Sequence, residues 1–198
     1  RVLMSELSGT ASILAKMKEF GIDTEKESGR KVLEHLKHME SEGYQFEGAD
    51  ASFELLVRRL NDGIKPPFRL EGFRIFVDVT GNNVSSEASI KVVDSTGMME
   101  HTAANGNGPV NALDRAVRKA LERFYPELRE VRLADYKVRV IDSKDATGAK
   151  VRVLIRSTDG EASWTTVGVS TNVIEASLIA LLDSMEYKLM KGSQPSSS

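Results

Sequence analysis

The sequence predicts an α+β fold, in which a helical connector precedes two βββα units related by a pseudo-twofold axis. Three observations support this prediction. Apolar residues recur at helical spacing in the first third of the chain, they alternate in short strand-like runs further on, and the second part repeats itself. The expected divisions are a connector at 1–65, a regulatory unit at 66–191 made of repeats 66–130 and 131–191, and a disordered tail at 192–198.

Bulk composition is that of an ordinary soluble globular protein. The chain has 198 residues, of which 40% are hydrophobic and 28% charged, with a net charge of −2 and no cysteine. Disulfides, thiolate metal sites and cysteine nucleophiles are therefore excluded. No apolar run approaches the roughly 18 residues that span a bilayer, and no signal peptide is visible, so we expect a cytoplasmic protein without membrane contact. The chain starts at Arg1, directly in helical sequence, which suggests that it continues a longer protein.

Three short amphipathic helices are expected in the connector. A capping box formed by Thr24 and Glu27 opens the second, and Asp50 caps the third. Gly21 and Gly43 end the first and the second. Their apolar stripes are Ile13, Leu14 and Met17, then Val32, Leu33, Leu36 and Met39, and finally Phe53, Leu56, Val57 and Leu60.

Strands and helices alternate in the same order twice after Pro66-Pro67. The expected strands are 74–79, 88–93 and 98–104, followed by a helix at 110–125, and then 136–141, 151–155 and 163–169, followed by a helix from 171 or 172 to about 189. Each unit has one apolar sheet face and one apolar helix stripe. Neither unit buries both alone, so the two are expected to pack together.

Residue matches support the repeat. Ile90, Val92 and Gly97 match Val153, Ile155 and Gly160 at an offset of 63, while Val110, Ala112, Ala116 and Val117 match Ile174, Ala176, Ala180 and Leu181 at an offset of 64. The alanines of these sets are small enough to let the two long helices approach each other closely.

The stretch from Asn105 to Ala112 is the strongest candidate for a binding site. Gly106, Gly108 and Asn107 allow a tight turn, and Pro109 suits the first turn of a helix. Unpaired N–H groups and the positive end of the helix dipole favour a carboxylate or phosphate there. A glycine-rich turn with no ligand is the alternative.

Catalytic and metal motifs are weak. His35 and His38 lie three residues apart on an expected helix without a further ligand in evident reach, and His101 lies in a strand without an obvious nucleophile. Trp164, the only tryptophan, is expected in the core or an interface. The chain itself is therefore expected to be non-catalytic and to hold no metal or cofactor.

A second function class remains open. A three-stranded unit followed by a basic helix is also typical of double-stranded-RNA-binding modules. The cations concerned are Arg115, Arg118, Lys119, Arg123, Arg129 and Arg132. Acidic residues interleave with them, so a solvated mixed-charge face is favoured over binding of nucleic acid.

Several long motifs resemble the regulatory domain of the α-isopropylmalate synthase and citramalate synthase family. Residues 105–113 resemble the signature of its first repeat, and residues 164–170 with 172–177 that of its second. Residues 135–140 and 151–153 resemble the strands between them. Residues 43–54, Gly43 to Glu54, resemble the connector of the citramalate synthase branch, which is therefore favoured. Residues 5–9 resemble the segment that leaves the catalytic barrel, but Thr10-Ala11-Ser12 departs from the polar run expected next.

The resemblance implies a division of labour. Family members are acyltransferases that condense acetyl-CoA with a 2-keto acid on a metal-dependent N-terminal barrel, which this sequence lacks. The part present is expected to form a homodimer, to contact its own catalytic domain and to bind the end-product amino acid for feedback inhibition. That effector is isoleucine for citramalate synthases, which act in isoleucine biosynthesis, and leucine for 2-isopropylmalate synthases, which act in leucine biosynthesis.

The resemblance also implies an effector pocket. Its residues, transferred by motif, are Gly106, Asn107, Gly108, Pro109, Ala112, Leu133, Tyr136, Val140, Ala149 and Val151. An apolar pocket separates leucine from isoleucine poorly, so the effector stays open between them. Asp135 and the carbonyls of the turn are candidate partners for its amino group.

Overall fold

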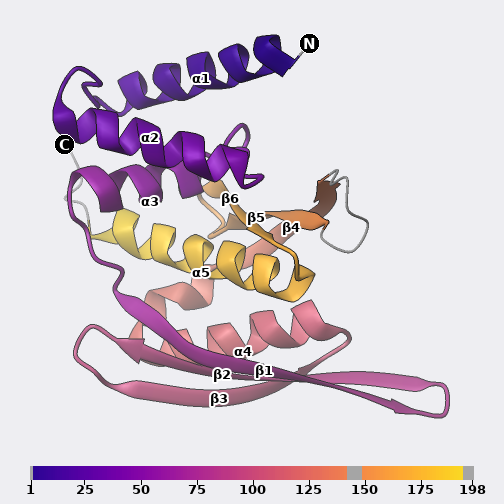
Figure 1. The fold of residues 1–198 in the computed structure, drawn as a ribbon. Coiled ribbons are helices and arrows are strands. Elements are labelled where there is room, and N and C mark those ends of the chain that lie inside the picture. The colour runs from indigo at the N-terminus through magenta and orange to yellow at the C-terminus, as the bar shows by residue number, and fades with distance from the viewer. Residues whose placement is uncertain (1, 142–148, 194–198) are drawn as a thin grey trace.

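The structure, a computed structural model, describes residues 2–141 and 149–193 (Figure 1). The elements follow the expected order: α1 (Val2–Glu19), α2 (Glu27–Ser41), α3 (Asp50–Asn61), β1 (Phe68–Thr80), β2 (Asn83–Asp94), β3 (Met99–Gly106), α4 (Pro109–Phe124), the 3-10 helix η1 (Pro126–Glu130), β4 (Arg132–Ile141), β5 (Lys150–Thr158), β6 (Ser163–Ser170) and α5 (Val173–Gly192). The α+β class and the two βββα units are confirmed.

Two antiparallel three-stranded sheets enclose the two long helices. Strands β1-β2-β3 form one sheet and β4-β5-β6 the other, each in chain order. Helices α4 and α5 lie between the sheets, and the connector helices α1–α3 lie beyond the second sheet (Figure 1). One apolar cluster draws buried residues from both units, so the repeats share a single core.

The two sheets repeat each other, but equivalent residues of β2 and β5 lie 65 positions apart and not the predicted 63. Ile90 pairs with Thr102 and Ile155 pairs with Thr166, and both threonines donate to a helix carbonyl, so Ile90 corresponds to Ile155 and not to Val153. Ile90, Val92, Val153 and Ile155 are all fully buried in the shared core. The turns that follow β2 and β5 both place glycine in the left-handed region, with φ of 90° at Gly97 and 94° at Gly160. Trp164, the only tryptophan, is buried, and its Nε1–H donates to the carbonyl oxygen of Ser184 (3.1 Å).

The small residues on the long helices also bring each helix close to its own sheet. The Thr102 hydroxyl donates to the Ala116 carbonyl oxygen (3.0 Å), and the Thr166 hydroxyl donates to that of Ala180 (2.7 Å). A Cβ at Gly168 would lie 2.0 Å from the Ala176 carbonyl oxygen. The alanines therefore bring each helix onto its own sheet, because a larger side chain would hold the two layers apart.

The connector helices begin differently from the prediction. Helix α2 begins at Glu27 with Lys26 as its N-cap, and no side chain caps it, so the capping box at Thr24 was wrong. Ala49 is the N-cap of α3, and Asp50 is its first helical residue rather than its cap. Before α2 several polar residues compete for the cap, whereas at α3 the buried Ala49 takes the N-cap position and Asp50 enters the helix.

The connector packs against the outer face of the second sheet. Phe46, Phe53 and Val57 belong to an apolar cluster that includes Val167 of β6, with Leu154 of β5 against it. The stripe residues Leu14 and Leu60 instead lie 38% and 42% exposed. The helices thus bury most of their apolar sides on the sheet.

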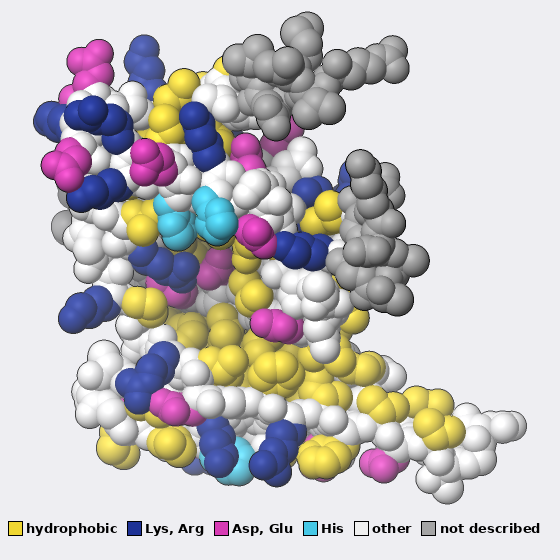
Figure 2. All heavy atoms as spheres, viewed as in Figure 1, with side chains coloured by type: hydrophobic (Ala, Val, Ile, Leu, Met, Phe, Trp, Pro, Cys, Tyr) yellow, Lys and Arg dark blue, Asp and Glu magenta, His cyan; other side chains and the backbone are white. Residues whose placement is uncertain are grey.

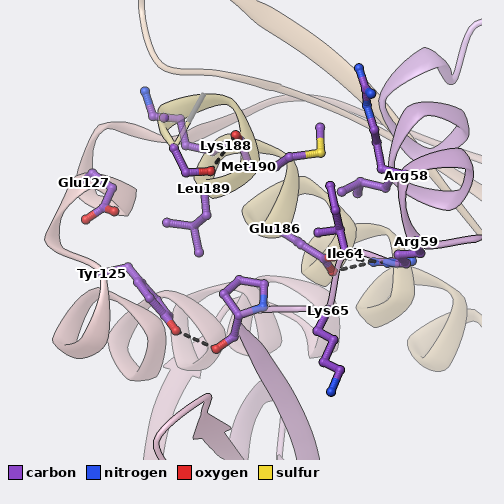
Figure 3. A pocket seen from close by; sticks show the side chains of 14 residues that line it. Arg58, Arg59, Ile64, Lys65, Tyr125, Glu127, Glu186, Lys188, Leu189 and Met190 are labelled. Atoms are coloured by element: carbon purple, nitrogen blue, oxygen red, sulfur yellow. Dashed lines mark hydrogen bonds and ion pairs between the residues drawn. The ribbon is translucent and has the colours of Figure 1, made fainter. Parts of the chain in front are cut away.

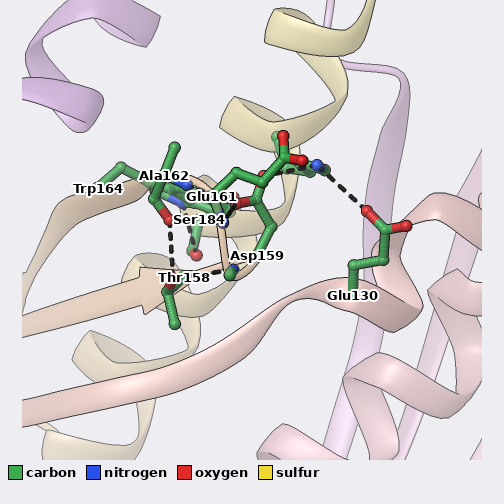
Figure 4. A network of polar contacts seen from close by, with 9 residues as sticks. Glu130, Thr158, Asp159, Glu161, Ala162, Trp164 and Ser184 are labelled. Atoms are coloured by element: carbon green, nitrogen blue, oxygen red, sulfur yellow. Dashed lines mark hydrogen bonds and ion pairs between the residues drawn. The ribbon is translucent and has the colours of Figure 1, made fainter.

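A polar network joins the two repeats at the turn after β5 (Figure 4). The Lys188 ammonium of α5 lies 2.7 Å from the Asp159 carboxylate and 3.6 Å from that of Glu130 in η1. Asp159 also accepts the N–H of Ala162 (2.8 Å). Lys188 and the N–H groups of Ala162 and Glu161 together lower the pKa of Asp159.

Several elements extend beyond their predicted limits. Strand β1 starts six residues earlier than expected, at Phe68, and α5 runs to Gly192, the first residue of the predicted tail. Residues 194–198 of that tail lie outside the described residues. Among the helices of the described chain, none combines the length and the hydropathy that a membrane span requires.

Candidate functional site

The loop between β3 and α4 lies tightly against the helix that follows it. A Cβ at Gly106 would lie 2.4 Å from the Ala112 nitrogen and 2.7 Å from its Cα. Neither Gly106 nor Gly108 has a positive φ, and Gly108 is extended at φ −164°. Glycine is therefore required at 106 by close approach of two backbone segments, and not by the turn conformation that the sequence suggested.

Helix α4 begins without a side-chain cap. Gly108 is the N-cap, Pro109 occupies the first turn as predicted, and no acidic residue lies in that turn. The related helix α5 differs, because the Asn172 side chain accepts the N–H groups of Ile174 (2.9 Å) and Glu175 (3.4 Å). The start of α4 thus keeps its positive dipole end uncompensated, which favours an anionic group.

A cavity of about 620 Å³ lies alongside α4 and against β4. Two of the predicted pocket residues, Leu133 and Tyr136, line it. The remaining lining residues are Val110, Asn111, Asp114, Arg118, Glu122, Arg129 and Arg132. The fold therefore brings the first turn of α4 in repeat one next to the first strand of repeat two, as the predicted pocket requires.

Asp114 is the residue of this cavity that the sequence analysis missed. Its carboxylate accepts two hydrogen bonds from Arg118 Nε, at 3.0 and 3.1 Å. Burial raises the pKa of Asp114, while Arg118 and Arg115 act in the opposite direction. The charges of this helix were predicted to form a solvated mixed-charge face, whereas the side chains of Asp114 and Arg118 are each only 16% exposed.

The candidate amino-group partner Asp135 points elsewhere. Its carboxylate accepts the N–H of Tyr136 (3.0 Å) and lies 3.5 Å from Lys137, and it does not line the cavity. Tyr136 itself is anchored to α5, because its hydroxyl shares a hydrogen bond of 2.8 Å with the Ser177 hydroxyl. The aromatic ring thus lies between the cavity and the second long helix.

The other predicted pocket residues fall into two groups. Gly106, Asn107, Gly108, Pro109 and Ala112 flank the start of α4, and Ala112 is fully buried beneath it. Val140 and Val151 are paired partners near the free end of the second sheet, with Ala149 beside them. Neither group lines the 620 Å³ cavity, which begins at Val110 and Asn111, so only Leu133 and Tyr136 of the ten predicted residues lie on it.

Apolar side chains are exposed where both sheets extend past their helices. Figure 2 shows apolar atoms gathered above the first sheet and along its β1–β2 hairpin. We call this set the hairpin-end surface. Its members are more than 40% exposed, and they are Val77, Val79, Val84, Val138 and Val140. Exposed apolar side chains gathered at the ends of sheets can mark interaction sites.

Four of the six cations of the predicted basic face, Arg115, Arg118, Lys119 and Arg123, make contacts within the fold. Arg115 donates to the Asn105 carbonyl oxygen (3.1 Å), and Lys119 donates to that of Ala103 (3.1 Å). Arg123 lies 3.8 Å from the Glu100 carboxylate. These contacts hold α4 against β3 and disfavour the nucleic-acid alternative.

In the described part of the chain, the surroundings of His101 do not indicate a catalytic or metal-binding role. His101 Nε2 lies 2.8 Å from the Ser89 hydroxyl on the exposed face of the first sheet. Within residues 2–141 and 149–193, no three His, Asp or Glu side chains are grouped to hold a metal ion.

Comparison with known proteins identifies relatives over nearly the whole chain. The model of the LeuA allosteric (dimerisation) domain matches residues 47–189. The (R)-citramalate synthases of Geobacter sulfurreducens and Aquifex aeolicus are 52% and 49% identical over 98% and 96% of this chain. The 2-isopropylmalate synthase of Acetivibrio thermocellus is 24% identical over 93%. The chain spans only 37%, 37% and 34% of the length of these relatives.

Proposed function

Because the chain belongs to the LeuA allosteric (dimerisation) domain family, we propose that it is the effector-binding and dimerising part of a citramalate synthase. The observation that supports this most directly is the cavity between α4 and β4, which lies beside an uncapped helix start. The higher identity to citramalate synthases favours that branch over 2-isopropylmalate synthase.

The cavity offers complementary groups to an aliphatic amino acid. The α-carboxylate would lie at the N-terminal end of α4, where N–H groups and the dipole favour negative charge. Asp114 would accept hydrogen bonds from the ammonium group, since its carboxylate is half-buried and pairs with a single cation, Arg118. Leu133 and Tyr136 would contact the aliphatic side chain. We assign isoleucine as the effector, with leucine as the alternative in a 2-isopropylmalate synthase.

The hairpin-end surface is the proposed contact between two copies of the chain. Val79 and Val140 are 68% and 70% exposed, although each lies on the sheet face that packs against a helix further along. Covering such side chains with a second copy removes apolar area from water, at roughly 25 cal/mol per Å². A twofold dimer would bury the same residues on both copies.

Helix α5 would transmit occupancy of the cavity to the connector. Its Ser177 contacts Tyr136 at the cavity. Two turns later, Asp183 and Glu186 accept hydrogen bonds from Arg59 of α3, each at 3.1 Å. Ser52 of α3 donates to Asp183 as well (2.9 Å). A ligand that moves β4 against α5 would therefore act on α3, provided that it binds two arrangements of these elements unequally.

The chemistry of the parent enzyme would lie outside this chain. We propose that the complete protein is an acyltransferase of the cytoplasm that condenses acetyl-CoA with pyruvate in isoleucine biosynthesis. The chain would then sense the end product of the pathway, form a homodimer and contact its own catalytic domain. No step of the condensation is assigned to the residues described.

Calorimetric titration of the chain with isoleucine, leucine and valine tests the proposal. Saturable binding that prefers isoleucine supports it, and a preference for leucine transfers the assignment to the 2-isopropylmalate synthase branch. Absence of heat with all three, in a sample shown to be a folded dimer, contradicts effector binding. The variant Asp114→Asn should weaken binding, whereas Asp135→Asn is the matched control.

A further inference from the structure

A second cavity lies at the opposite ends of the two long helices. Its volume is about 560 Å³, and its walls come from α3, from segment 62–67 and from the ends of α4 and α5 (Figure 3). The connector, repeat one and repeat two all contribute residues. Small-molecule sites commonly have volumes of about 300–1,000 Å³, so the space is sufficient for a compact ligand.

The interior of this cavity is apolar. Figure 3 shows Ile64, Tyr125, Leu189 and Met190 arranged around one space. Leu189 and Met190 are only 9% and 8% exposed, although they line it. The Tyr125 hydroxyl donates to the Pro67 carbonyl oxygen (2.6 Å), which satisfies its polar end and leaves the ring as a wall. An apolar body therefore finds matching surface on three sides.

The charged lining is mostly paired, and one cation is not. Arg59 is held by Glu186, and Arg58 lies 3.0 Å from the Asp62 carboxylate. Lys188 is held by Asp159 and Glu130, as described above. Among the described residues, Lys65 has no ion partner.

The unpaired acid of the lining lies away from that cation. Glu127 also has no ion partner in the described part of the chain, but Figure 3 places it on the far side of Tyr125 from Lys65. Lys65 is exposed beside Ile64, and Figure 3 shows its side chain extending away from Leu189 and Met190, so the ammonium lies at the outer edge of the cavity. An anionic group at that edge would meet an unpaired ammonium without facing Glu127.

We propose that this cavity is a second ligand site, which takes a compact apolar molecule carrying one anionic group. The apolar body lies against Ile64 and Leu189, and the anion lies toward Lys65. Arg59 and Glu186, which join α3 to α5, form part of the wall. Occupancy therefore holds the connector against the repeats, from a place separate from the cavity beside α4.

The test uses two fluorescent probes that share an aromatic skeleton. Anilinonaphthalene sulfonate carries one anion, and phenylnaphthylamine is its uncharged counterpart. The intact chain should bind the sulfonate at one saturable site and more tightly than the amine. Ile64→Trp, which fills the cavity, should abolish that site, and Lys65→Gln should weaken it by up to about fivefold. Val140→Trp and Lys37→Gln are the matched controls and should leave it unchanged.

Two results would overturn the proposal. One is sulfonate binding that survives Ile64→Trp but is lost in Val140→Trp, which would place the probe on the hairpin-end surface. The other is equal affinity for both probes, which would remove the anionic requirement. Leu189→Phe fills the same space and replaces Ile64→Trp if that variant does not unfold cooperatively. Calorimetry with isoleucine reports separately on the site beside α4, so failure of either site is recognised independently.

Discussion

The close approach of Gly106 to α4 makes a quantitative prediction. In Gly106→Ala the new Cβ would meet the Ala112 nitrogen at 2.4 Å, whereas carbon contacts are favourable near about 3.5 Å. The atoms it meets are backbone atoms of a helix, so the strain must shift the start of α4 by about 1 Å. Overpacking of this kind costs about 2 kcal/mol, which corresponds to a melting temperature lower by about 4–8 °C.

Thermal and urea unfolding measure this loss, with Gly72→Ala as the matched control. A Cβ at Gly72 meets nothing within 4 Å and its φ is not positive, so the same substitution should be neutral or slightly stabilising there. Because α4 begins beside the cavity, Gly106→Ala should also weaken effector binding. Equal stability of the two variants, within about 0.5 kcal/mol, would refute the close-approach explanation.

Three further predictions concern the ion pair, the repeated threonine and the hairpin-end surface. Lys188 lowers the pKa of Asp159, so the ionised Asp159 stabilises the fold above its ordinary pKa of about 3.9, and this stability is lost as the pH falls. The variant Asp159→Asn should therefore be less stable than the parent at neutral pH and equally stable in acid. A loss of stability that does not depend on pH would contradict this. Thr166→Val removes the hydroxyl that donates to the Ala180 carbonyl, and it should lower the free energy of unfolding in urea by about 1 kcal/mol. Thr165→Val is the control, because the Thr165 hydroxyl makes no hydrogen bond of this kind to α5. Val140→Asp should convert the dimer to a monomer in sedimentation analysis, and an unchanged dimer would exclude that surface.

Much of the fold follows from local patterns. The similar apolar runs around Ile90 and Val153 identified the repeat, because both lie on the buried face of their strands, although the strand register makes Ile155 the equivalent of Ile90. Pro109 indicated the start of α4 for a steric reason that depends on a single residue. By contrast, Thr24 and Asp50 were assigned wrongly as caps. Lys26 is the N-cap of α2, and the buried Ala49 is the N-cap of α3, where tertiary packing and not a local side-chain cap fixes the helix start.

The candidate site was less accessible to sequence reasoning. Leu133 and Tyr136 were proposed through resemblance, and the structure places them beside α4. Asp114 was not proposed, because its half-buried state depends on β4, a strand that follows it by almost twenty residues. The same limit applies to the cavity near Lys65, whose walls are assembled from segments that no local pattern connects.

A crystal structure of the chain with isoleucine tests the central claim most directly. The proposed function predicts one amino acid per chain beside the start of α4, with its ammonium group within hydrogen-bond distance of Asp114 and its side chain against Leu133 and Tyr136. An amino acid bound elsewhere, with the cavity between α4 and β4 filled only by water, would contradict the assignment of the effector site.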